Sequence, residues 1–337
     1  MRLNCIRRYD ALIKKCEAIL SDENPAPAAG HRYRAYGLLF SSDIPIAHFM
    51  EADSIEEPDV YIRQGKIFGS SYTPPASMQI ETSPGKLLLR GAKSATILVT
   101  EGNSIIIEPL PGGDPATIQQ MMLGWAFAGL FHQRAMLPLH GSTLCMGGDC
   151  FVFCAPSGGG KSTLTSSFLK RDFSFLDDNV ALVDFQNGMA FITSGSPELR
   201  LWEDSMHTLE FEHKVVGRIR PELDKTSIIA RSNFRSEKAR LGKIFILKRG
   251  TASTVSFVHV TGAAKFQALM ENVFCIKFIN DGGFSPGIFH RVHKLAESVP
   301  VVDILLPGRL PSPDKLCDII LSSQEIQSTT SQQAVEV

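Results

Sequence analysis

Residues 150–170 read CFVFCAPSGGGKSTLTSSFLK and contain the strongest signal in the chain. The apolar run 150–154 has the composition of a strand, whereas residues 162–170 have the spacing of a short amphipathic helix with Leu164 facing inward. Between them, the three glycines 158–160 can turn backbone N–H groups toward phosphate oxygens, and the helix N-terminus adds its dipole. The stretch therefore predicts a strand, loop and helix unit that binds phosphate.

The loop is close to the Walker A pattern G-x-x-x-x-G-K-[ST]. In that pattern Lys161 reaches the β- and γ-phosphates of ATP, and the Ser162 hydroxyl is a ligand of Mg²⁺. Ala155 stands where the pattern has its first glycine, so the loop entry must adopt a backbone conformation open to alanine. The alternative is a glycine-rich turn with a chance Lys-Ser pair. The predicted nucleotide-binding residues are Ala155, Pro156, Ser157, Gly158, Gly159, Gly160, Lys161, Ser162 and Thr163.

Two adjacent carboxylates, Asp177 and Asp178, follow the apolar run 173–176. Carboxylates at the end of a buried strand are costly unless a cation or hydrogen bonds offset them. Beside a phosphate-binding loop the cation would be Mg²⁺. One carboxylate can hold the metal, usually through water, while the other accepts the proton of an attacking hydroxyl. The alternative is a solvated turn, for which Asn179 is also suited.

His140 lies between the apolar residues 137–139 and Gly141. A lone histidine is more often structural than catalytic. This one is expected on the strand next to that of the loop, joined to it by the turn at 147–149, and this position favours a functional role.

Cations for a transferred phosphoryl group can come from the charge-rich segment 210–240. Most members of such a segment form a solvated surface. Lys225 and Arg231 are candidates, together with Arg200 upstream.

Three pieces of sequence resemble the catalytic domain of bacterial HPr serine kinase/phosphorylase, in the same order and at similar spacing. They are Leu-His-Gly at 139–141, SGGGKS at 157–162 and LDDNV at 176–180. That family has a phosphoenolpyruvate-carboxykinase-like fold. The resemblance implies that Asp178 accepts the proton, that His140 and Lys161 are active-site residues, and that Mg²⁺ binds Ser162 and a later glutamate.

The family places that glutamate in a Glu-Ile-Arg-Gly segment, and residues 198–200 match its Glu-x-Arg core. The residues that follow depart from the family pattern, which disfavours the phosphorylase half of the activity and leaves Glu203 as a rival ligand. The candidate catalytic residues are Asp178, His140, Lys161, Asp177 and Arg200, and the candidate Mg²⁺ contacts are Ser162, Glu198 and Asp177.

The predicted fold class is α/β, a P-loop kinase domain with a mixed sheet, preceded by a smaller β-rich domain. The expected boundaries are an N-terminal helix and linker at 1–30, the β-rich domain at 31–113, the catalytic domain at 114–321 and a disordered tail at 322–337. This layout resembles the HPr-kinase-like proteins encoded with ribosomally made peptides. In lasso-peptide clusters such proteins phosphorylate a serine of the precursor.

Composition excludes several classes of function. The chain has 337 residues, a net charge of −1 and 44% hydrophobic residues, which argues against a nucleic-acid or membrane partner. Its seven cysteines form no C-x-x-C pair, and we expect reduced core residues in a cytoplasmic protein. The most hydrophobic stretch, 121–131, is eleven residues long, shorter than the ~20 residues of a membrane span.

These observations predict an ATP- and Mg²⁺-dependent kinase that phosphorylates a serine hydroxyl of a peptide or protein, with a lasso precursor peptide as one candidate acceptor. The alternatives are a bifunctional HPr kinase/phosphorylase, a small-molecule kinase and a nucleotide-binding regulator that transfers no phosphate. A hydroxyl acceptor needs a base and a regulator does not, so the Asp177-Asp178 pair favours transfer. Homo-oligomer formation is left open.

Overall fold

The computed structural model describes residues 30–67, 73–156, 158–202, 206, 213–220, 223–250, 253–278, 286–323 and 326. The N-terminal helix expected before residue 30 and almost all of the tail expected after residue 321 lie outside these residues, as do Ser157 and Glu203. None of the helices in the described part of the chain combines the length and apolar character that a membrane span requires.

Residues 31–109 form an eight-stranded sheet in the order β3-β1-β2-β4-β8-β7-β6-β5, here called the N-terminal sheet. Most neighbours are antiparallel, but β2 and β8 both run parallel to β4. The strands are β1 (His31–Ala35), β2 (Leu38–Ser42), β3 (Met50–Glu51), β4 (Val60–Gln64), β5 (Gln79–Ser83), β6 (Lys86–Arg90), β7 (Ala95–Thr100) and β8 (Ser104–Pro109).

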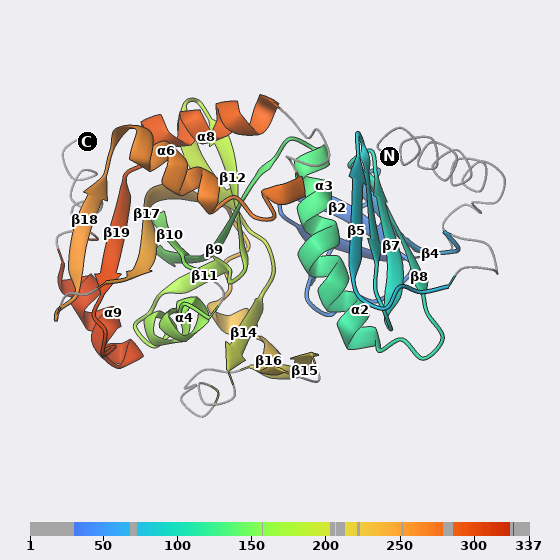
Figure 1. Ribbon diagram of the computed structural model, residues 1–337, viewed down its shortest axis with the longest axis horizontal. Helices are drawn as coiled ribbons and strands as arrows, with labels where there is room; N and C mark the ends of the chain where they lie inside the picture. Colours follow the sequence, from blue (N-terminus) through green and yellow to red (C-terminus); the bar gives the residue numbers. More distant parts are fainter. Residues whose placement is uncertain are drawn as a thin grey trace.

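A helical segment connects this sheet to the rest of the chain. It consists of α2 (Pro115–Met121), a π-helical stretch (Met122–Ala126) and α3 (Phe127–Gln133). The Asp114 side chain accepts a hydrogen bond from Thr117 N (2.8 Å) and caps α2, whose first residue is Pro115. The segment stands between the two halves of the molecule (Figure 1), and α3 contacts both β7 and β9.

The second large sheet is mixed, as expected, in the order β10-β9-β12-β13-β17-β19-β18, with β11 on β9. β10 also pairs with β17, so part of the sheet closes on itself. A third sheet has the order β14-β16-β15. The strands are β9 (Leu137–Met146), β10 (Asp149–Cys154), β11 (Ser174–Asp177), β12 (Val180–Gln186), β13 (Met189–Thr193), β14 (Glu198–Trp202), β15 (Lys214–Arg220), β16 (Leu223–Ile229), β17 (Ala239–Arg249), β18 (Ser256–Val260) and β19 (Val301–Leu306).

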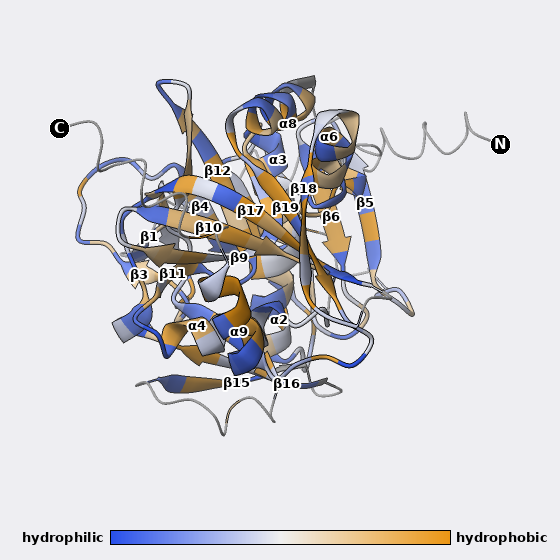
Figure 2. Cartoon of the chain, turned by 90° about the vertical axis from the view of Figure 1, so that its left-hand side faces the viewer, coloured by the Kyte–Doolittle hydropathy of each residue, from blue (hydrophilic) through white to orange (hydrophobic). Residues whose placement is uncertain are grey.

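Helices cover both faces of the second sheet (Figures 1 and 2). Alternate residues of a strand face opposite sides, so Val152 of β10 joins the cluster beneath α6 (Gly262–Glu271) and α8 (Pro286–Ser298). Its neighbour Phe153 joins the cluster beneath α4 (Lys161–Leu169) and α9 (Pro313–Ser322). The apolar strands therefore form a buried layer between two helical layers.

One hydrophobic cluster connects the two halves of the chain. It contains Phe40 of the first sheet, Phe127 and Phe131 of α3, and Leu139 and Ala181 of the second sheet, all of them buried. Because the two sheets share this core, residues of the first sheet come close to the strand ends of the second.

Candidate active site

The glycine-rich loop joins β10 to α4. Gly158 and Gly160 have φ angles of +78° and +89°, in the left-handed region that side chains with a Cβ rarely adopt. Ala155 is buried and has no such angle, so this position accepts alanine, as the sequence requires. The nucleotide contact predicted at Ser157 lies outside the described residues. Two of the three loop glycines therefore have backbone angles that favour glycine.

Lys161 begins α4 and is 8% exposed. Its ammonium group donates to the Ala155 carbonyl (Nζ to O, 2.7 Å) and lies 3.1 Å from His140 Nε2. Burial lowers the pKa of Lys161, and the Asp178 carboxylate opposes that shift. No carboxylate of the described residues forms an ion pair with this buried ammonium group, whose two contacts are both neutral.

His140 is held by groups on three sides. Its Nδ1 lies 3.2 Å from the Asn179 carbonyl, which can only accept, so Nδ1 carries the proton and Nε2 accepts from Lys161. The ring stacks on Phe274 with centroids 5.4 Å apart. Burial and the Lys161 charge lower the pKa of His140 to about 4, so the imidazole is neutral near pH 7.

The low pKa of His140 makes its contribution to stability depend on pH. Between pH 6.5 and about 4 the unfolded chain protonates this side chain and the folded chain does not, so stability is lost as pH falls through this window. Glutamine does not titrate, so His140→Gln lacks this loss. As pH falls below 6.5, the free energy of unfolding of the wild type should therefore drop relative to that of His140→Gln, by at most about 1.4 kcal/mol per pH unit. Denaturant titrations from pH 5 to 8 measure it, and a difference independent of pH would contradict the buried, neutral imidazole.

Asp178 directly follows β11 and is 4% exposed. Its Oδ1 accepts from Ser142 Oγ (2.6 Å), its Oδ2 accepts from the Arg200 backbone N–H (3.2 Å), and the Ser162 side chain also hydrogen-bonds to it. Burial raises the pKa of Asp178 despite these hydrogen bonds and the Lys161 charge. The carboxylate is thus more basic than an exposed aspartate and interacts with Ser162, the second residue of α4.

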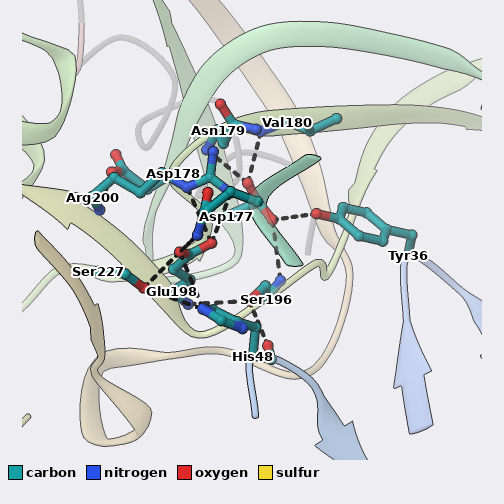
Figure 3. Close-up of polar contacts among 11 residues, drawn as sticks. Tyr36, His48, Asp177, Asp178, Asn179, Val180, Ser196, Glu198, Arg200 and Ser227 are labelled. Atoms are coloured by element: carbon teal, nitrogen blue, oxygen red, sulfur yellow. Dashed lines mark hydrogen bonds and ion pairs between the residues drawn. The ribbon is translucent and has the colours of Figure 1, made fainter. Parts of the chain in front are cut away.

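The Asp177 carboxylate points toward Tyr36 and is saturated with hydrogen bonds (Figure 3). Its Oδ1 accepts from the backbone N–H groups of Asn179 and Val180, both at 2.7 Å. Its Oδ2 accepts from Tyr36 Oη (2.9 Å) and Ser196 N (3.1 Å). Burial raises the pKa of Asp177 to about 6, against the effect of these bonds. Each oxygen already accepts two hydrogen bonds, so the direct Mg²⁺ contact expected from the sequence would have to replace one of them.

Glu198 forms a buried ion pair with Arg200. Its Oε2 accepts from Arg200 Nε (3.1 Å) and Nη2 (2.9 Å), and its Oε1 accepts from Ser227 Oγ (2.6 Å) and Gln120 Nε2 (3.1 Å), with His48 Nε2 3.3 Å away. Burial raises the pKa of Glu198, but Arg200 and His48 together hold it well below its ordinary value. Within the described ranges no three His, Cys, Asp or Glu side chains form a cluster that could hold a metal.

These contacts predict that Glu198 contributes more to folding than to metal binding. Glu198→Gln should lower the free energy of unfolding by about 3 kcal/mol, because Arg200 would be left buried without its charged partner. The Mg²⁺ concentration that half-saturates nucleotide binding should stay near the wild-type value. Chemical denaturation and calorimetry at several Mg²⁺ concentrations separate the two effects. If Glu198→Gln were as stable as the wild type but needed more Mg²⁺ for half-saturation of nucleotide binding, the metal role expected from the sequence would be supported instead.

The remaining cation candidates lie in different places. Lys225 pairs across β14 and β16 with Trp202, and its Nζ lies 5.0 Å from the centroid of a Trp202 ring. Burial lowers the pKa of Lys225 and the Asp178 charge opposes this, which places it in the electrostatic field of the site. Arg231 is exposed and contacts Met50 Sδ (3.0 Å), away from these groups.

Several residues around the carboxylates carry no motif. Ser142 could have been inferred, because it is two positions after His140 on one strand and so faces the same side. The others come from distant segments and have no local signal: Tyr36, His48, Gln120, Ser196 and Ser227.

Comparisons with known proteins add little to this geometry. No protein-family model matches the chain, and no curated protein matches it. Among solved structures, the chain is similar to the HPr(Ser) kinase/phosphatase from Coxiella burnetii, with 11% sequence identity and a TM-score of 0.31 over 59% of this chain and 99% of that one. A superposition this loose transfers no mechanism, so the chemistry is inferred from the side chains themselves.

Proposed function

We propose that this chain is an ATP- and Mg²⁺-dependent kinase that phosphorylates a serine hydroxyl of a peptide or protein. The observation that carries the proposal is the placement of Asp178. This buried carboxylate, with a raised pKa, interacts with Ser162 directly after the glycine-rich loop and lies in the electrostatic field of Lys161. A nucleotide-binding regulator needs the loop but has no use for a base beside it.

The loop suits the phosphates of ATP. A buried ammonium group with only neutral acceptors favours an anion as a further partner, and Lys161 is such a group. A Cβ at Gly158 or Gly160 would meet nothing within 4 Å, so the loop is open on that side. The N-terminus of α4 adds backbone N–H groups and a positive dipole end.

The metal would be held mainly by Ser162. Mg²⁺ in kinases takes one or two protein oxygens and fills its shell with phosphate oxygens and water. Ser162 offers a hydroxyl at the start of α4, whereas the oxygens of Asp177 and Glu198 are occupied by hydrogen bonds. When bound, Mg²⁺ neutralises charge on the phosphates.

In the transfer step a carboxylate oxygen of Asp178 accepts the proton of the serine hydroxyl. The serine oxygen forms a bond to the γ-phosphorus of ATP, and the bond from that phosphorus to the β,γ-bridging oxygen breaks, releasing ADP. Lys161 and Lys225 supply positive charge near the transferred group, and neutral His140 orients Lys161 through Nε2.

Incubation of the purified chain with ATP, Mg²⁺ and three kinds of acceptor tests the proposal. The acceptors are serine-containing peptides, including a precursor peptide encoded nearby if there is one, the HPr protein and small alcohols. Mass spectrometry should find phosphoserine in a peptide or protein. Phosphorylation of small alcohols only would favour a small-molecule kinase, phosphorolysis of phospho-HPr would favour the bifunctional enzyme, and ATP binding without any transfer would favour the regulator.

A further inference from the structure

The turn between β1 and β2 reaches across to the carboxylate pair. Tyr36 and Gly37 occupy its centre with φ angles of +54° and +73°. A turn with two left-handed residues usually contains Asn-Gly, and a tyrosine held there costs on the order of 1 kcal/mol. Tyr36 is nevertheless 6% exposed and donates from Oη to Asp177 Oδ2, 141 residues away in the chain.

The segment opposite this turn is shaped to receive it. The Tyr36 backbone N–H donates to the Ser194 carbonyl (2.6 Å). At Gly195 a Cβ would lie 2.2 Å from Asp177 Oδ2 and 2.6 Å from Tyr36 Cε1. Only glycine at this position lets the Tyr36 ring and the Asp177 carboxylate approach from two sides.

His48, between β2 and β3, makes the second connection from the N-terminal sheet. It is 1% exposed, and its Nε2 lies 3.2 Å from Ser227 Oγ and 3.3 Å from Glu198 Oε1. Its carbonyl accepts from Ser196 Oγ, while its Nδ1 has no hydrogen-bond partner among the described residues. A buried nitrogen without a partner costs about 1–3 kcal/mol, so stability alone gives no reason for a histidine here.

We infer that Tyr36 and His48 are positioning residues of the kinase site, through which the N-terminal sheet sets the geometry of Asp178. Tyr36 fixes Asp177, which through Asn179 and Val180 holds the turn that carries Asp178. His48 fixes Glu198 and hence Arg200, whose backbone N–H donates to Asp178 Oδ2. Both connections end at Asp178, the first through the turn that follows Asp177 and the second through Arg200 (Figure 3). This inference rests on the proposed function.

Tyr36→Phe tests the first connection, because it removes one hydroxyl and keeps the ring that packs against Phe131. Tyr33→Phe is a matched control on β1, the strand that leads into this turn: the Tyr33 hydroxyl accepts from the Ile46 N–H (2.9 Å) and not from a group of the site. Both variants should lose similar stability. We expect Tyr36→Phe to lower kcat about 10-fold and to leave KM for ATP unchanged. A displaced catalytic group can cost up to ~10²-fold in rate, so a loss of about 10-fold fits a small shift of Asp178. Tyr33→Phe should keep the wild-type kcat.

His48→Leu and His48→Gln test the second connection. Leucine removes the donor to Glu198, whereas glutamine keeps a side-chain N–H, so kcat should fall with leucine and largely recover with glutamine. Equal kcat for Tyr36→Phe and Tyr33→Phe, or for the two His48 variants, would overturn the positioning role while wild-type transfer remained intact. A wild-type chain that transfers no phosphate would overturn the proposed function, and the inference with it.

Discussion

Asp178→Asn should lower the rate of phosphoryl transfer by about 10²–10⁴-fold, the usual contribution of a general base. Asparagine keeps the size of the side chain: its amide oxygen can accept from the Arg200 backbone while its NH2 group donates to the Ser142 hydroxyl, but it cannot take a proton. The affinity for MgATP should therefore stay close to that of the wild type. Rapid-quench measurement of phosphopeptide formation, with calorimetry for nucleotide affinity, separates the two quantities.

Asp184→Asn is the matched control for this change. Asp184 lies on β12, close in sequence to Asp178, and its carboxylate accepts from Gln186 Nε2 (3.2 Å) instead of from a residue of the loop. The same loss of charge there should leave transfer intact. Near-normal transfer by Asp178→Asn would refute the assigned base.

Lys161→Ala should weaken MgATP binding by about 10- to 100-fold, since a hydrogen bond to a charged group contributes ~1.5–3 kcal/mol. The fold should remain intact, because the variant removes a buried ammonium group that has no carboxylate partner among the described residues. Calorimetric titration with MgATP measures the affinity, and thermal unfolding checks the fold.

Lys170→Ala is the control for this second variant. Lys170 caps the other end of α4 and pairs with Asp314 (3.7 Å). Removing its charge should change stability slightly and leave MgATP affinity unchanged. If Lys161→Ala bound MgATP as tightly as the wild type, the glycine-rich loop would not be the nucleotide site.

The sequence was sufficient where the signal is local. The strand, glycine-rich loop and helix at 150–170 form one continuous unit, and their conformation follows from glycine content and apolar spacing. The nearness of His140 and Asp178 to the loop was also accessible, because β9 pairs with both β10 and β11. The turn at 147–149 is a short connection that places β9 beside β10, whereas β11 pairs with β9 only after the chain has passed through β10 and α4.

The sequence was insufficient where a role depends on distant partners. Asp177 and Asp178 are adjacent and chemically identical, yet Tyr36 and the backbone N–H groups saturate one, while the other contacts the loop. Glu198 matched a metal-ligand pattern, but its charge is balanced by Arg200. Nothing local in the segments around Tyr36 and His48 indicates that they reach these carboxylates, because the contacts form only when the two sheets share a core.

The most direct test of the central claim is a single-turnover measurement with γ-labelled ATP and Mg²⁺, comparing the wild type with Asp178→Asn on a serine-containing acceptor. We predict that the wild type moves the label from ATP to the serine oxygen, and that Asp178→Asn binds the same amount of ATP but retains the label on the nucleotide. Equal transfer by the two proteins, or bound ATP with no transfer by the wild type to any acceptor, would contradict a kinase with Asp178 as its base.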